Sequence, residues 1–120
     1  KYKIMDKFLY FSKGTIDGTT STEEVAMFPV SRISHFEMAN ATDLKIYFAA
    51  SQEFNKHVDN SVVSLDIVSG KHKEVLQDIS AAINAHPNLD PCIVIGDEEN
   101  SVYASAHISA VASIVVVEAS

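Results

Sequence analysis

The feature that most constrains the fold is the alternation of residue types from Val102 to Val116. Every even-numbered residue in this segment is apolar, and serine, histidine or tyrosine occupies most of the odd positions. A period of two is typical of a β-strand with one apolar and one polar face. Fully extended at about 3.3 Å per residue, the segment would run roughly 50 Å, whereas a compact chain of this length is only about 35 Å across. The segment must therefore bend, break into a hairpin, or leave the body and pack on a neighbour.

The composition predicts one globular domain over residues 1–120. Hydrophobic residues make up 47% of the chain and charged residues 21%, which excludes a disordered chain. No apolar run approaches the ~20 residues of a membrane helix, and residues 1–11 lack the apolar core of a signal peptide. The net charge of −7 argues against the DNA backbone as a partner, so we expect neither a nucleic-acid nor a membrane partner. The single cysteine, Cys92, excludes a disulfide framework within the chain.

Six further segments have the composition or the alternation of β-strands. They are Lys7–Phe11, Val25–Val30, Arg32–Met38, Asp43–Ala49, Ser61–Val68 and Ile93–Ile95. Pro29 interrupts the second of these, which places that segment at a sheet edge or a strand end. The polar stretches Ser12–Glu24 and Ala50–Asn60 are expected to be surface loops.

One segment, Lys71–Ala85, has a helical period instead. Its apolar stripe consists of Val75, Leu76, Ile79, Ala82 and Ile83. This spacing predicts an amphipathic helix. Ser69 or Gly70 is expected to cap the helix, and Pro87 to end it.

We therefore expect an α+β fold, a mostly antiparallel β-sheet or sandwich with a single amphipathic helix at about residues 71–85. Such a helix is about 22 Å long and about 10 Å wide, so it covers two or three strands spaced about 4.8 Å apart. The remaining apolar sheet surface needs a second sheet, closure into a barrel, or another subunit. Ile93–Ile95 and Ile114–Val117 are apolar at every position, which calls for cover on both faces. An oligomer and a self-sufficient sandwich both stay open.

The side chains that could carry chemistry form no recognisable motif. The histidines are His35, His57, His72, His86 and His107. Their spacing does not suit metal ligation on one helix, so we interpret them as scattered surface or half-buried residues. Cys92, which opens an apolar strand, is interpreted as a small buried residue rather than a nucleophile. The sequence thus predicts no catalytic, cofactor-binding or metal-binding residues, and a protein that is not an enzyme.

Three carboxylates, those of Asp97, Glu98 and Glu99, crowd the turn after Ile93–Ile95. A calcium site needs six to eight oxygens at regular offsets, which this turn alone does not supply. We therefore expect a solvated hairpin turn.

Two other features leave alternatives open. Lys71–Lys73 places cations at a helix N-terminus, which costs a few tenths of a kcal/mol for each charge. These side chains either dock an acidic surface or an anion, or extend into water near Glu74 and Asp78, on the polar side of the helix. The small residues from Ala104 to Ser113 either admit another layer at close approach or form a thin part of the domain's own core.

A set of segments in this order supports a family resemblance. The most distinctive block is Gly70-Lys71-His72-Lys73-Glu74-Val75, which follows Asn60-Ser61-Val62-Val63-Ser64-Leu65. The other matching segments are Lys7–Phe11, Phe28–Ser31, Leu44–Phe48, Ile83–Asn84, Ile93–Asp97 and the Ser/Ala-rich C-terminal strand. Over nearly its whole length the chain resembles a group of small virion proteins of marine tailed phages, cyanophages among them.

The resemblance implies a structural protein located in the virion capsid. The expected function is that of a capsid decoration or cement protein, which binds and stabilises the assembled shell as an oligomer. Its expected partners are copies of itself and a major capsid protein. The resemblance brings no catalytic residues, and it implies a subunit-facing role for Lys71–Glu74. Two alternatives remain: a head–tail or tail accessory structural protein, and a cytoplasmic small-ligand-binding module or enzyme subunit that uses Cys92 or His72.

Overall fold

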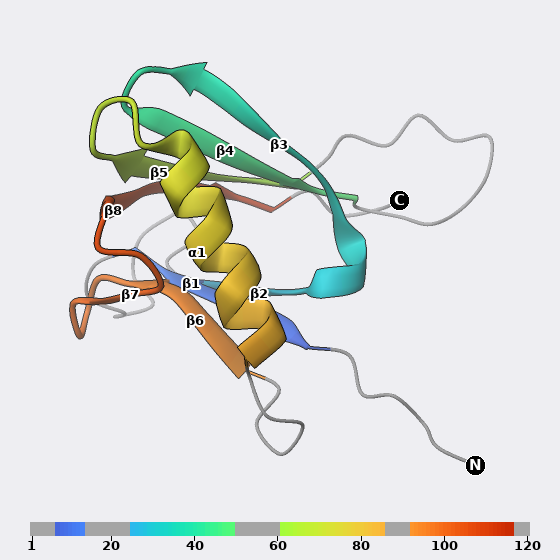
Figure 1. Ribbon diagram of the computed structural model, residues 1–120. Helices are drawn as coiled ribbons and strands as arrows, with labels where there is room; N and C mark the ends of the chain where they lie inside the picture. Colours follow the sequence, from blue (N-terminus) through green and yellow to red (C-terminus); the bar gives the residue numbers. More distant parts are fainter. Residues whose placement is uncertain (1–6, 14–24, 50–60, 86–91, 117–120) are drawn as a thin grey trace, which may run out of the picture.

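The computed structural model describes residues 7–13, 25–49, 61–85 and 92–116. In this part of the chain it contains two four-stranded sheets and one helix, which is the expected α+β architecture (Figure 1). Sheet A has the strand order β2-β1-β6-β7 and consists of β1 (Phe8–Ser12), β2 (Val25–Pro29), β6 (Cys92–Asp97) and β7 (Val102–Tyr103). Sheet B has the order β3-β4-β5-β8 and consists of β3 (Ile33–Asn40), β4 (Asp43–Phe48), β5 (Ser61–Ile67) and β8 (Ile108–Val115). A short 3-10 helix, Val30–Arg32, leads from β2 into β3.

The strand pairing is mostly antiparallel, as the sequence predicts. The exception is β1, which runs parallel to β6 although the two strands lie far apart in the sequence. The strand β2 lies at the edge of sheet A and ends at Pro29, which confirms the expected position of this proline. Most of the two predicted surface loops, residues 14–24 and 50–60, lies outside the described residues.

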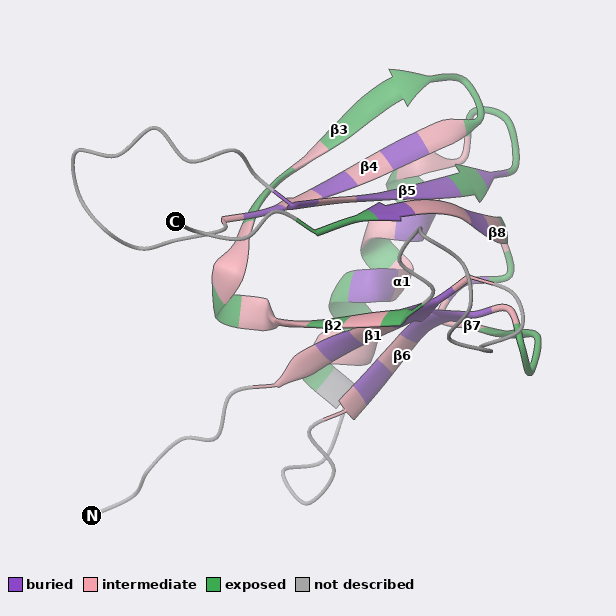
Figure 2. Cartoon of the chain, turned by 180° about the vertical axis from the view of Figure 1, so that it is seen from behind, coloured by how far each residue is buried: buried purple, intermediate pink, exposed green. Residues whose placement is uncertain are grey.

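The core lies between the two sheets, and the helix α1 (His72–Ala85) closes one side of the space between them (Figure 1). Buried residues alternate with less buried ones along β1, β4 and β6, as the purple bands in Figure 2 show. The cluster contains Leu9, Phe11, Leu44, Ile46, Phe48, Val63, Leu65, Ile67, Val75, Ile79, Ile93, Ile95, Ile108, Val111 and Ile114. A second sheet thus supplies the cover that one helix cannot give.

Aromatic rings join the two sheets. Phe28 of sheet A stacks on Phe48 of sheet B, with ring centroids 4.2 Å apart and an interplanar angle of 8°. Phe11 of sheet A meets Phe48 edge-on at 6.1 Å. Such aromatic pairs add to the stabilisation by area burial alone.

The helix occupies the predicted residues, with Val75 and Ile79 fully inside the core. The predicted caps are wrong, because Ser69 and Gly70 lie in the turn before the helix, where Gly70 has a φ of 77°. The first helical hydrogen bond runs instead from the Val75 amide to the Lys71 carbonyl (3.0 Å). The predicted stop, Pro87, lies outside the described residues.

At the other end of the helix, the Lys7 ammonium donates to the Ile83 carbonyl (2.7 Å). A cation at a helix C-terminus interacts favourably with the helix dipole. This contact attaches the end of the helix to the residue that precedes β1 in sheet A.

The segment from Val102 to Val116 breaks, as its length requires, but the strict alternation expected within it is wrong for β8. The segment breaks at a turn over residues 104–107, which separates β7 from β8. In addition, the pairing of β8 with β5 shifts register twice, and each shift inserts one extra residue into β8. The buried residues of β8 are therefore Ile108, Val111 and Ile114, three apart rather than two.

Candidate functional site

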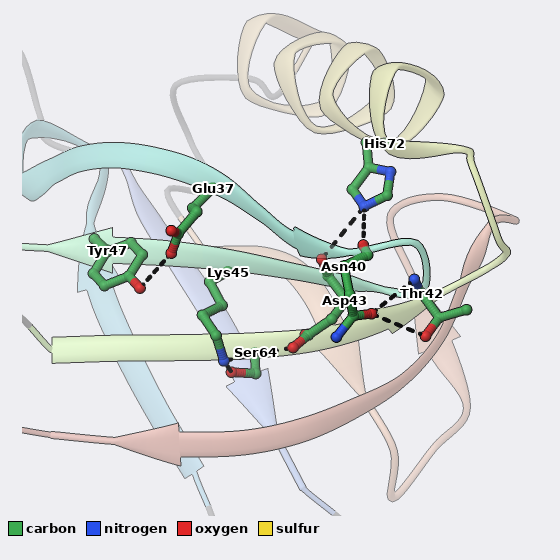
Figure 3. A network of polar contacts seen from close by, with 8 residues as sticks. All are labelled: Glu37, Asn40, Thr42, Asp43, Lys45, Tyr47, Ser64 and His72. Atoms are coloured by element: carbon green, nitrogen blue, oxygen red, sulfur yellow. Dashed lines mark hydrogen bonds and ion pairs between the residues drawn. The ribbon is translucent and has the colours of Figure 1, made fainter.

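The outer face of sheet B is polar, and its side chains form hydrogen bonds across neighbouring strands (Figure 3). The Tyr47 hydroxyl donates to the Glu37 carboxylate (2.6 Å), which raises the pKa of Tyr47 because the bond holds the phenolic proton. The His35 ring stacks on Tyr47 with centroids 4.4 Å apart and an interplanar angle of 10°. On the next strand pair, the Lys45 ammonium donates to the Ser64 hydroxyl (2.9 Å). The polar groups of these side chains thus find hydrogen-bond partners within the chain.

His72 connects the start of the helix to the turn between β3 and β4. Its Nε2 lies 2.8 Å from the Asn40 carbonyl and 3.3 Å from the Asp43 carbonyl. Because both partners are acceptors only, Nε2 must carry a hydrogen. The same turn receives a second bond, from the Gly70 amide to the Ala41 carbonyl (3.0 Å). The helix start is thus anchored to sheet B through main-chain carbonyls (Figure 3).

These contacts decide how the Lys71–Lys73 block is arranged. Neither open interpretation describes His72, because its ring faces the chain's own hairpin rather than a neighbour or bulk water. Lys73 is exposed and Lys71 is half-buried. The hydrogen bonds of His72 to sheet B stabilise the start of the helix. They offset the unfavourable placement of cations at the helix N-terminus.

The acidic turn after β6 is not simply solvated, contrary to the expectation. The carboxylate of Asp97 is buried and accepts hydrogen bonds from the Asn100 amide (2.9 Å) and the Ser12 hydroxyl (2.8 Å). These bonds, that from Asn100 foremost, lower the pKa of Asp97 although burial opposes them. Glu98 accepts a bond from the main-chain amide of Val111 (2.6 Å), and only Glu99 is exposed.

The seam between β6 and β8, where the two sheets meet, is closely packed. A Cβ on Gly96 would lie 2.5 Å from Cγ2 of Val111, so only glycine permits this approach of the two strands. The burial of Tyr103 beside this seam raises its pKa, and the charges of Glu98 and Asp97 add to the effect. Among the small residues from Ala104 to Ser113, Ala104 packs against the core and Ser105 is buried, which favours the alternative of the domain's own core at these two positions.

The turn over residues 104–107 also fastens the helix. The buried Ser105 hydroxyl donates to the Asp78 carboxylate (2.6 Å) and accepts from the His107 amide (3.1 Å). Asp78, which the helical pattern places on the polar side, thus joins the helix to the β7–β8 connection. Sequence reasoning missed this pair, because no local pattern links residues so far apart.

The residues considered for catalysis do not converge. Cys92 is half-buried at the start of β6 in sheet A, not fully buried as expected, and its Sγ lies 3.9 Å from Sδ of Met27. His72 lies against sheet B, and His107 lies in the β7–β8 turn. The remaining candidates, His57 and His86, fall outside the described residues. Within residues 7–13, 25–49, 61–85 and 92–116, no three His, Cys, Asp or Glu side chains are grouped to hold a metal ion.

The outer face of sheet A differs from that of sheet B, because most of its side chains are apolar, with Ser12 and Asp97 side by side at one end. The inward residues of β1 and β6 belong to the core, so the residues between them point outward. Strand registers place Tyr10 beside Met27 and Val94, and Phe8 beside Pro29 and Cys92. We call the outward side chains of β1, β2 and β6 other than Ser12 and Asp97 the apolar face: Phe8, Tyr10, Val25, Met27, Pro29, Cys92 and Val94.

Part of the apolar face is open to solvent. The exposed fraction is 51% for Met27 and 41% for Val25. Val94 lies between the fully buried Ile93 and Ile95, as expected for a strand that is apolar on both faces. The expectation of cover on both sides of this strand is met on the inner side by the core.

Comparisons with models of known protein families, with curated proteins and with solved structures find no match to this chain. Within the described residues, the single helix is too short to span a membrane.

Proposed function

We propose that this chain is a virion structural protein, a capsid decoration protein that binds and stabilises the assembled shell as an oligomer. The observation that carries the proposal is the apolar face of sheet A, which ends in the exposed side chains of Met27 and Val25. Exposed apolar patches on soluble proteins mark sites of contact with other molecules. The resemblance of the Lys71–Val75 block and its flanking segments to small phage virion proteins supports the same function.

The arrangement of polar groups favours a structural role over chemistry. His72 holds the helix start, Glu98 the β6–β8 seam and Asp78 the β7–β8 turn. A decoration protein needs no reactive group, because it stabilises a shell by binding only the assembled state. A rigid sandwich with one apolar and one polar outer face suits that task.

Co-sedimentation with purified shells that lack this protein tests the proposal. We expect saturable binding in a fixed ratio to the major capsid protein, together with a higher temperature of shell disruption. Binding to a few sites per particle would instead indicate the head–tail or tail accessory protein. A chain that leaves the shells unbound and their disruption temperature unchanged would contradict the proposal.

A further inference from the structure

We propose that the apolar face binds the same face of a second copy of this chain, in a two-fold symmetric and weak dimer. The inference deepens the proposed function, on which its role in an assembly rests, but the contact itself forms without a shell. It depends on the charge distribution over the two sheets and on the area of the face.

Charge decides which surfaces of two copies can meet. The chain has a net charge of −7, so two copies repel each other over most of their surface. The side chains of the apolar face are uncharged, and the charged group that shares the outer side of β1, β2 and β6 is Asp97, which is hydrogen-bonded to Ser12 and Asn100 at the end of β6. The outer face of sheet B presents Glu37, Asp43 and Asp66 with only Lys45 to oppose them on the same strands. Face-to-face contact through sheet A therefore buries apolar surface and involves one hydrogen-bonded carboxylate per copy, that of Asp97, in place of the three on sheet B.

Symmetry makes a second copy a fitting occupant. In an isologous interface the same patch serves both partners, so it must complement itself. The apolar face meets this condition, because any apolar side chain can pack on any other. Tyr10, Met27 and Val94 lie side by side across three strands and form the middle of the patch.

The area of the face determines the strength of the contact. Three strands about 4.8 Å apart and about 17 Å long cover roughly 240 Å². This is about a third of the ~800 Å² that each partner buries in a standard stable interface. The dimer must therefore be weak and depend on concentration. Copies held side by side on a shell would meet at millimolar effective concentration, which favours the contact there.

Sedimentation analysis of the full chain from about 10 µM to about 1 mM, the range of weak interfaces, tests the inference. We expect a shift from monomer toward dimer over this range. The Met27→Glu variant should associate at least about tenfold more weakly, because each substitution enters a two-fold interface twice. The matched control is Met38→Glu, at a methionine of sheet B with an exposed fraction of 65%, and it should associate like the wild type.

A second measurement needs no variant and so avoids any effect of substitution on folding. Amide chemical shifts of the wild type should change with concentration at Tyr10, Met27 and Val94, and stay constant at Glu37 and Lys45. A chain that remains monomeric at about 1 mM, or shifts that change on sheet B instead, would overturn the inference. Equal effects of the two glutamate substitutions on association would do the same.

The two proposals can fail separately. A dimer in solution that does not bind shells would refute the decoration function and leave the contact standing. A chain that binds shells but does not self-associate through the apolar face would refute the contact alone.

Discussion

Gly96 of β6 lies so close to Val111 of β8 that a Cβ on the glycine would be 2.5 Å from the valine Cγ2. Val111 is buried in the core, at a bulge of β8. Because its side chain is β-branched, it has little freedom to move aside. This contact closes the edge where sheet A meets sheet B.

Gly96→Ala should therefore lower the free energy of unfolding by about 1–3 kcal/mol, the usual cost of overpacking a core. Urea denaturation of the purified variant measures this loss. The double variant Gly96→Ala with Val111→Ala should recover part of the loss, because the second change removes the clashing methyl groups. Strictly additive losses in the double variant would contradict the close contact.

Glu98→Ala should lower the free energy of unfolding by about 1–3 kcal/mol, because it leaves the Val111 amide in the bulge without its acceptor. The matched control is Glu99→Ala, one residue further along the same turn, where the side chain is exposed. That substitution should change stability by less than about 0.5 kcal/mol. Thermal unfolding of the two variants in parallel makes the comparison, and equal losses would count against a specific role for Glu98.

Asp97 should make stability depend on pH in the acid range. Its pKa is lowered in the folded protein, so its contribution is fully present above the unfolded value of about 3.9 and is lost as pH falls through the folded pKa. Asp97→Asn should therefore differ most from the wild type above about pH 4, and the two should converge below it. Denaturant midpoints measured at a series of pH values test this, and a difference that grows on acidification would refute it.

His72→Ala should lower the free energy of unfolding by about 1 kcal/mol, because the Asn40 carbonyl loses its donor. Lys73→Ala, on the same helical turn but exposed, should instead leave stability unchanged or raise it by a few tenths of a kcal/mol. Hydrogen exchange at the β3–β4 turn provides a local readout, which should accelerate only in the His72 variant. Unchanged exchange there would contradict the anchoring role of the ring.

Local periodicity was sufficient to predict most of the secondary structure, including the helix over 72–85 and the edge position of Val25–Pro29. It failed on β8, because bulges are set by the pairing with β5 and not by β8 alone. One signal was present in the sequence: Val111 is an apolar residue at an odd position, where the alternation calls for a polar one.

The hydrogen bonds of the candidate site were harder to predict, because they join residues distant in the sequence. The bonds of Asp97 to Ser12 and of Glu98 to Val111 depend on the parallel pairing of β1 with β6 and on the approach of β6 to β8. The apolar face likewise arises only when β1, β2 and β6 are neighbours. Its signal in the sequence was the presence of aromatic residues at successive positions of β1, which cannot all point into one core.

The central claim is that the apolar face of sheet A is a contact surface, and two methionines of the same molecule test it directly. Met27 lies on this face and Met38 on sheet B, and both are exposed in the single chain. Peroxide oxidation rates of the two residues, measured by mass spectrometry on dilute protein and near 1 mM, give an internal ratio. We predict that concentration slows oxidation of Met27 several-fold relative to Met38. A ratio that does not change with concentration would contradict the account.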